Sequence, residues 1–225
     1  MTEQTRHANR NLNRWQQNHH RLSARTPANL AAAADVFKQA GIRCAGGAHR
    51  RAAIDEPVWE HAFTPWPAPR AFRQAPDFGG SADAYLEWIA IDVLPAIEKQ
   101  FGLNPLWRGV LGYSLAGLFA AYCSYRRFLF NRMAAVSASL WFDGWQQFAA
   151  ANTPLFLPEY AYFSVGSKEK NAKNPRLAQI ETAILATRQN WQAAGAVTFF
   201  ERNSGGHFEN ITQHLVKAAQ WLPGR

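Results

Sequence analysis

Short apolar runs alternate with amphipathic stretches along the second half of the chain. Four apolar runs predict buried strands: residues 107–113, 132–142, 161–167 and 196–201. Three stretches between and after these runs predict helices: residues 115–125, 174–195 and 209–222. Strands that alternate with helices pair in parallel through right-handed crossovers. The pattern therefore predicts an α/β fold with a mostly parallel central sheet and helices on both faces.

Upstream of these strands, the pattern predicts two further helices and a loop. Ser81 can cap a helix that continues to about residue 101. Pro95 should kink this helix, because proline has no backbone N–H to donate. Residues 60–80 are rich in proline and predict a surface loop. A short helix is expected at residues 27–41.

Charge divides the chain at about residue 51. Residues 1–51 contain nine Lys or Arg and two acidic residues, so they carry +7 of the formal net charge of +8. This segment shows neither a helical nor a strand period. The 225-residue chain is 48% hydrophobic, which is enough for one sizeable core. We therefore expect a basic, poorly patterned segment at 1–51 and one globular domain at 52–225.

Composition narrows the classes of function. The basic segment could contact phosphates, but no aromatic-interleaved or helix-turn-helix pattern accompanies it, so nucleic acid is not the expected partner. No apolar run is long enough for a membrane span and the polar N-terminus is not a secretory signal, so we expect a cytoplasmic protein. Cys44 and Cys123 are too few for a disulfide framework or a cysteine zinc site. No metal or organic cofactor is expected.

The first candidate for chemistry is Ser114 in "GYSLAG", at the junction of a predicted strand and a predicted helix. A nucleophile elbow needs small residues two positions before and two after the serine, because the strand and the helix come into close contact there. Gly112 and Ala116 occupy these positions. A small serine packed beneath a helix would fit the motif alone equally well.

A serine hydroxyl needs a base to take its proton. His207 lies in the glycine-rich stretch "NSGGHFEN", directly after the last predicted strand and before the last predicted helix. The other six histidines lie in the basic segment, in the proline-rich loop or inside the final helix. His207 is therefore the candidate general base, and a solvated loop residue is the alternative interpretation.

A third group must orient the imidazole of such a base. Glu169 is the one carboxylate in the stretch that follows the predicted strand 161–167, although it stands between Lys168 and Lys170 as a solvated charge would. Asp143, one strand earlier, is the rival. The position in the chain favours Glu169.

An oxyanion hole needs two backbone N–H groups. The residue after the nucleophile, Leu115, would supply one of them. The second should follow an early strand, where "IRCAGGAH" offers Gly46 as a weak candidate, but no clear strand precedes it.

From about Gly79 to the C-terminus, the sequence resembles the esterase D-like α/β-hydrolases, nearest to the enterobactin (siderophore trilactone) esterases. The matching pieces occur in the same order along the chain: "FGGSADAYLEWI", "VLPAIEKQF", "GYSLAGLFAAY", "VSASLWFDG", "VGSKE" and "GGHFENI". The resemblance implies an α/β-hydrolase domain that cleaves small-molecule carboxylic esters through an acyl-enzyme on Ser114, with His207 as base. Some siderophore esterases of this group work with a Ser–His pair, so the role of Glu169 stays open.

The resemblance also implies a substrate pocket and exposes a departure. Tyr113, Trp141, Phe142 and Trp145 would border the pocket, where aromatic walls suit a catechol acyl group; a buried aromatic cluster is the alternative for the last three. Residues 1 to about 50 do not match the family. One interpretation is a truncated or frame-shifted segment that lacks the first strands and an oxyanion donor. The alternative function is then a weakly active or non-catalytic hydrolase relic or binding protein.

Overall fold

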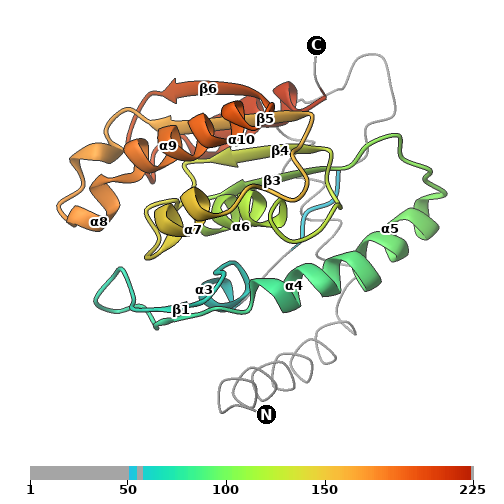
Figure 1. Cartoon of the computed structure of the whole chain (residues 1–225), viewed down its shortest axis with the longest axis horizontal. Helices are drawn as coiled ribbons and strands as arrows, with labels where there is room; N and C mark the ends of the chain where they lie inside the picture. Colours follow the sequence, from blue (N-terminus) through green and yellow to red (C-terminus); the bar gives the residue numbers. More distant parts are fainter. Residues whose placement is uncertain (1–50, 55–57, 224–225) are drawn as a thin grey trace. The chain divides into compact units, whose positions relative to one another are not determined.

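Four parallel strands form the centre of the structure, a computed structural model that describes residues 51–54 and 58–223. The strands lie side by side in the order β3 (Gly109–Tyr113), β4 (Arg132–Val136), β5 (Tyr160–Gly166) and β6 (Val197–Asn203) (Figure 1). Each neighbouring pair is parallel. The predicted mostly parallel α/β fold is therefore confirmed, and each strand falls within or close to its predicted apolar run.

Burial explains why these runs form strands. Every residue from Met133 to Val136 in β4 and from Ala161 to Gly166 in β5 is buried. Central strands covered on both faces read as continuous apolar runs and not as alternating ones. The edge strand β6 alternates instead, and it exposes Val197 and Phe199.

Helices cover both faces of this sheet. Their bounds are α6 Leu115–Cys123, α7 Trp145–Ala151, α8 Pro175–Ala178, α9 Ile180–Ala193 and α10 Ile211–Trp221 (Figure 1). Phe163 of β5 contacts Trp191 of α9, with ring centroids 5.5 Å apart, whereas the preceding residue, Tyr162, contacts Trp221 of α10 at 5.6 Å. Successive strand residues point to opposite faces, so α9 and α10 lie on opposite sides of the sheet.

The strand β4 is shorter than predicted. The apolar run 132–142 predicts one long strand, but β4 ends at Val136. The next residue, Ser137, has φ 45°, a left-handed conformation that no strand can continue through. The rest of the run, including Leu140 and Phe142, is buried as a turn and not as a strand.

Several short elements come before the first strand of this sheet in the chain. They are α3 Trp59–Ala62, the paired strands β1 Pro67–Ala68 and β2 Phe78–Gly79, α4 Ala82–Trp88, the π-helical turn η2 Ile89–Val93, and α5 Leu94–Phe101. The proline-rich stretch 60–80 thus holds a small hairpin. Ser81 stands at the N-cap position as predicted, but its side chain makes no capping hydrogen bond.

The expected disturbance at Pro95 takes the form of that π-helical turn. In η2, the N–H of Leu94 bonds the carbonyl of Ile89, five residues back. Pro95 has no N–H with which to continue the normal ladder, so the helix widens by one residue just before it. The helical path continues from η2 into α5, with Pro95 in the first turn of α5.

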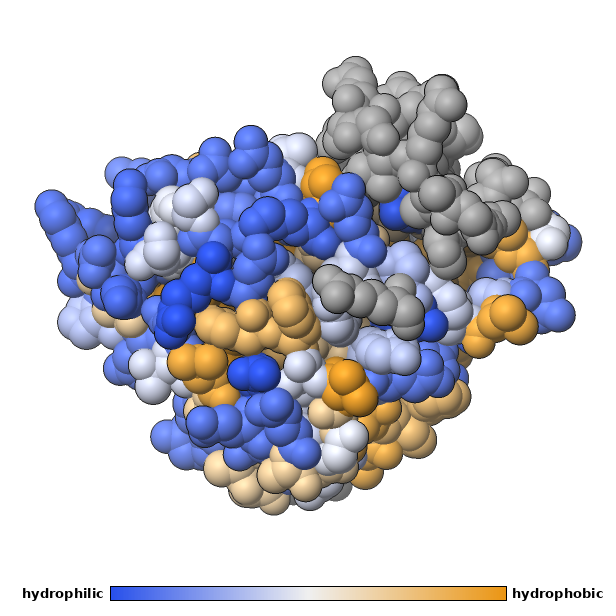
Figure 2. Space-filling view, turned by 90° about the horizontal axis from the view of Figure 1, so that it is seen from above, coloured by the Kyte–Doolittle hydropathy of each residue, from blue (hydrophilic) through white to orange (hydrophobic). Residues whose placement is uncertain are grey.

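The remaining surface is mixed. The face shown in Figure 2 is largely hydrophilic, with small apolar areas among the polar ones. Within the described residues, no helix is both long and apolar enough to cross a bilayer. The predicted helix at 27–41, Gly46 and the question of missing early strands all lie outside the described residues.

Candidate active site

The carboxyl ends of the parallel strands meet at one edge of the sheet, and the candidate residues follow them. Ser114 comes directly after β3, Glu169 shortly after β5, and His207 after β6. Loops at this edge of an open parallel sheet are the usual place for functional side chains. The topology therefore brings together residues that are far apart along the chain.

Ser114 occupies a strained turn between β3 and α6. Its backbone has φ 57° and ψ −119°, a conformation that is costly for a residue with a side chain. The N–H of Ser114 donates to the carbonyl of Val136 at 3.0 Å, which ties the turn to the neighbouring strand. A Cβ on Gly112 would stand 2.0 Å from the carbonyl oxygen of Ala116. The tight strand–helix contact that the motif requires is therefore present.

His207 bridges the serine and the glutamate. Its Nε2 lies 3.0 Å from Oγ of Ser114, and its Nδ1 lies 2.5 Å from Oε2 of Glu169. An ionised carboxylate can only accept, so Nδ1–H donates to Glu169. In the neutral imidazole this leaves Nε2 free to accept the hydroxyl hydrogen of Ser114. The three side chains form a continuous hydrogen-bonded row.

Glu169 is buried, with 5% of its surface exposed, yet it is well supplied with donors. Its Oε1 accepts from the hydroxyl of Ser137 and from the N–H of Gly166, each at 2.6 Å. Burial, the largest single influence, acts to raise the pKa of Glu169, but the hydrogen bonds from His207 and Ser137, the charge of His207 and the Gly166 N–H together lower it below its ordinary value. The carboxylate therefore stays ionised near neutral pH.

The rival carboxylate is engaged elsewhere. Oδ2 of Asp143 lies 2.9 Å from Nη2 of Arg176, and the carbonyl of Asp143 accepts a hydrogen bond from Trp66. Of the two acids, it is Glu169 that contacts His207. The ion pair between Asp143 and Arg176 joins the turn after β4 to α8.

The predicted pocket residues lie in different environments. Tyr113 donates its hydroxyl hydrogen to the backbone carbonyl of His207, and burial raises the pKa of Tyr113 to about 12, so this donor stays protonated. Phe142 and Trp145 belong to the packed interior, and Nε1 of Trp145 donates to Thr187 at 3.0 Å. Trp141 retains 9% exposure. Burial favours the aromatic-cluster interpretation for Phe142 and Trp145.

Of the two backbone groups predicted as oxyanion donors, the structure describes that of Leu115 and not that of Gly46. Leu115 is the first residue of α6, so its N–H has no carbonyl within the helix to bond and is available beside Ser114. Gly46 lies outside the described residues. Of the two predicted donors, Leu115 is the one that the structure describes.

Three further residues lie next to the row that the sequence did not predict as site residues. The hydroxyl of Ser139 lies 3.2 Å from Oγ of Ser114, and Ser137 contacts Glu169. Phe208 is 77% exposed beside His207, with ring centroids 5.0 Å apart. The two serines lie in "VSAS", inside the run 132–142 that the pattern predicts as one strand, and only the observed end of β4 at Val136 places them at the edge where parallel sheets gather functional side chains.

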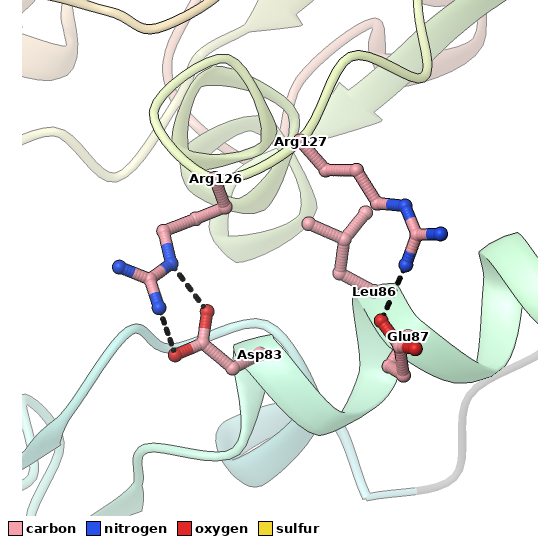
Figure 3. A pocket seen from close by; sticks show the side chains of 5 residues that line it. All are labelled: Asp83, Leu86, Glu87, Arg126 and Arg127. Carbon is pink, nitrogen blue, oxygen red and sulfur yellow. Dashed lines mark hydrogen bonds and ion pairs between the residues drawn. The ribbon is translucent and has the colours of Figure 1, made fainter.

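A separate pocket of about 360 Å³ opens at the other end of α6. It is lined by Leu86 and by two ion pairs, Asp83 with Arg126 at 2.8 Å and Glu87 with Arg127 at 2.5 Å (Figure 3). A ligand there would have to displace contacts that the charges already make with each other. The two ion pairs join α4 to the segment after α6, and this pocket is not the candidate site.

The described residues offer no group of three or more His, Cys, Asp or Glu side chains that could hold a metal ion. Cys123, the cysteine within the described range, is buried and free, and burial raises the pKa of its thiol. The chemistry available at the strand ends is that of a hydroxyl, an imidazole and a carboxylate.

Comparison with protein families decides the classification. The Esterase family model matches residues 45–215, which is most of the chain and contains all three residues of the row. The chain belongs to the Esterase family. The family resemblance stated from the sequence is therefore confirmed. No curated protein matches the chain at the level of significance that we require.

Solved structures share the fold of this esterase-family chain. A siderophore hydrolase EstB from Aspergillus nidulans superposes with a TM-score of 0.59 at 21% identity over 74% of this chain and 65% of that one. An IroE-like serine hydrolase from Shewanella oneidensis gives 0.60 at 18% identity, over 73% and 56%. The enterobactin hydrolase IroE in complex with DFP gives 0.56 at 22%, over 74% and 64%. The chain thus spans less than two thirds of the length of these structures, and the likeness shows the fold.

Proposed function

We propose that this esterase-family chain is a serine hydrolase that cleaves carboxylic esters of small molecules through an acyl-enzyme on Ser114. The observation that carries the proposal is the hydrogen-bonded row in which His207 stands 3.0 Å from Oγ of Ser114 and 2.5 Å from Glu169. The strained backbone of Ser114 supports it, because such strain is retained where function requires it.

In the proposed acylation step, His207 Nε2 accepts the hydroxyl proton as Oγ of Ser114 attacks the ester carbonyl. Glu169 keeps the imidazole in the tautomer with hydrogen on Nδ1 and stabilises the imidazolium that forms. His207 then gives its proton to the leaving alkoxide, so the alcohol departs neutral and the acyl group stays on Ser114. Water enters next, loses a proton to His207 and attacks the acyl carbon; His207 then returns this proton to Oγ of Ser114 as the acyl–oxygen bond breaks and the carboxylic acid departs.

Charge on the carbonyl oxygen during both steps needs backbone donors. We propose the N–H of Leu115 for one of them, because it stands free at the start of α6 next to the serine. Gly46 remains the proposed source of the second. The partial positive charge of the helix N-terminus adds to the stabilisation of the oxyanion.

For the substrate class, we propose an ester or lactone that carries an aromatic acyl substituent, as siderophore trilactones do. The support comes from neighbours of the same fold that are described as a siderophore hydrolase and as an enterobactin hydrolase. The exposed ring of Phe208 beside His207 offers a surface on which an aromatic acyl group could stack.

The nucleophile is tested by hydrolysis of p-nitrophenyl acetate by the wild type and by Ser114→Ala. Loss of the nucleophile should lower kcat by roughly 10³-fold or more. Ser124→Ala is the matched control, because Ser124 is a buried serine at the opposite end of α6, and it should hydrolyse the ester at the wild-type rate. Equal rates for Ser114→Ala and the wild type would refute the assignment.

Covalent labelling and substrate comparison refine the test. A fluorophosphonate probe should attach to Ser114, and mass spectrometry of the digested protein should place the label there. A folded wild type that takes no label would favour the non-catalytic alternative. Hydrolysis of enterobactin with a higher kcat/KM than p-nitrophenyl acetate would support the siderophore class, and a lower value would contradict it.

A further inference from the structure

A single turn after β4 supplies hydroxyls to both ends of the hydrogen-bonded row. Ser137 Oγ lies 2.6 Å from Oε1 of Glu169, at the acid end. Ser139 Oγ lies 3.2 Å from Oγ of Ser114, at the nucleophile end. The two serines are separated by Ala138 alone. One short segment, which contains none of the three residues of the row, therefore contacts the row at both ends.

The backbone of this turn is fixed at several points. The N–H of Ser137 donates to the carbonyl of Ser164 at 2.8 Å, and the N–H of Ser139 donates to the carbonyl of Ser114 at 2.9 Å. Ser137 is held at φ 45°, a conformation that surrounding contacts must stabilise. A Cβ on Gly117 would stand 2.8 Å from that of Ala138, so α6 closes directly onto the turn.

None of the three turn residues has exposed surface: Ser137, Ala138 and Ser139 are all 0% exposed. Their hydroxyls can reach the row but cannot reach a substrate. Any effect they have on chemistry must therefore act through Ser114 or Glu169, which makes them positioning residues and not catalytic ones.

The directions of the hydrogen bonds follow from the chemistry of the row. An ionised Glu169 can only accept, so Ser137 donates to it. Oε1 is then occupied by Ser137 and by the N–H of Gly166, which leaves Oε2 for His207. At the other end, Ser114 gives its own hydrogen to His207, so Ser139 must be the donor between the two serines.

We propose that the turn Ser137–Ser139 is a positioning element that sets the direction of proton transfer along the row. The proposal rests on the proposed function of Ser114 and His207. Ser139 donates to Oγ of Ser114, and so holds the hydroxyl with its own hydrogen directed at Nε2 of His207. Ser137 keeps Glu169 ionised and turned so that Oε2 faces the imidazole.

The test uses the full chain with Ser137→Ala and Ser139→Ala, and Ser164→Ala as the matched control. Ser164 is 0% exposed, it lies on the adjacent strand β5, and its Oγ makes no hydrogen bond with the three described side chains of the row. Its removal creates a similar void without touching the row. Ser137→Gly is a second variant for the acid end, because glycine accepts φ 45° without strain. Steady-state hydrolysis of p-nitrophenyl acetate is measured for each variant over a range of pH.

For Ser139→Ala we expect kcat to fall about 10-fold with KM unchanged, because Oγ of Ser114 loses the contact that holds it in line with His207. The rate of labelling by a fluorophosphonate should fall by a similar factor, since the same oxygen attacks the probe. Ser164→Ala should match the wild type in both measurements. An equal loss in Ser139→Ala and Ser164→Ala would show a packing effect and overturn the proposal for the nucleophile end.

For Ser137→Ala and Ser137→Gly we expect the acid limb of the kcat/KM profile to move to higher pH. The hydrogen bond from Ser137 lowers the pKa of Glu169, so without this donor the carboxylate holds a proton more tightly, which favours the protonated, inactive enzyme. A void alone would lower the rate without moving the limb, so an unmoved limb in both variants would overturn the proposal for the acid end.

Failure of this proposal can be told apart from failure of the proposed function. If Ser114→Ala is inactive while the serine variants of the turn behave like Ser164→Ala, the hydrolase assignment stands and the positioning role is wrong. If Ser114→Ala is as active as the wild type, the proposed function itself is wrong.

Discussion

The backbone of Gly112 lies so close to Ala116 that a Cβ at position 112 would stand 2.0 Å from the Ala116 carbonyl oxygen. This contact joins the end of β3 to the first turn of α6 and sets the place of Ser114 between them. The space at position 112 is therefore part of the geometry that presents the serine to His207.

Gly112→Ala should accordingly damage both stability and activity. Relief of the clash requires the strand or the helix to move, which costs about 1–3 kcal/mol of the free energy of unfolding, and any shift of Ser114 weakens its alignment with His207. Thermal unfolding and hydrolysis of p-nitrophenyl acetate would measure the two effects. The control is Gly102→Ala, where no atom lies within 4 Å of the added Cβ: it should lose some stability to backbone strain, since φ is 59°, but keep its kcat. Full activity in Gly112→Ala would contradict the expectation.

Glu169→Gln and Asp143→Asn distinguish the two candidate acids. Glutamine cannot stabilise an imidazolium at His207, so we expect kcat to fall by about 10²–10⁴-fold. Asp143 pairs with Arg176 at a partly exposed site, so Asp143→Asn should leave kcat near the wild-type value and cost at most about 1 kcal/mol of stability. Both rates come from the same p-nitrophenyl ester assay. The reverse order of effects would transfer the role to Asp143.

The lowered pKa of Glu169 predicts a dependence of stability on pH. A carboxyl group whose pKa is lower in the folded chain than its ordinary value of 4.5 contributes stability that is fully present above that value and is lost as the pH falls through the folded pKa. The difference in unfolding free energy between the wild type and Glu169→Gln should therefore be largest near neutral pH and shrink in acid. Urea denaturation of both proteins at several pH values measures it, and a difference that grows towards acid would contradict the direction of the shift.

Phe208→Ala tests whether the exposed ring beside His207 contacts the acyl group. An aromatic pair adds about 0.5–1.5 kcal/mol to binding, so KM for a p-nitrophenyl benzoate should rise about 3–10-fold, while KM for the acetate stays nearly constant. Phe128→Ala is the matched control, because Phe128 is also exposed but precedes β4 at the opposite edge of the sheet. Equal changes for both esters would remove the stacking role.

Much of the framework is predictable from local pattern. The apolar runs locate the strands because a central parallel strand must be apolar on both faces, and the order Ser114, Glu169, His207 follows from residues that come after strand ends. Gly112 and Ala116 indicate the tight turn because only small residues permit it. Each of these signals depends on residues close together in the chain.

The rest of the site depends on contacts that local pattern does not contain. The run 132–142 is predicted as one strand, because no residue type in it indicates that Ser137 adopts a left-handed backbone conformation. The burial of Glu169 between two lysines, and the donors that reach it from Ser137 and Gly166, arise only when β4 and β5 lie side by side. Trp145 reads as a pocket residue, and only the packing of α7 against α9 places it inside, where it bonds Thr187.

The row joins residues that follow strands at both margins of the described sheet. Ser114 follows β3 at one margin and His207 follows β6 at the other, three strand spacings or about 14 Å away, yet their reactive atoms are 3.0 Å apart. The segment after β6 must therefore reach back over two strands to close the gap. The distance between Ser114 and His207 therefore depends on the path of this segment as well as on the strands from which the two residues follow.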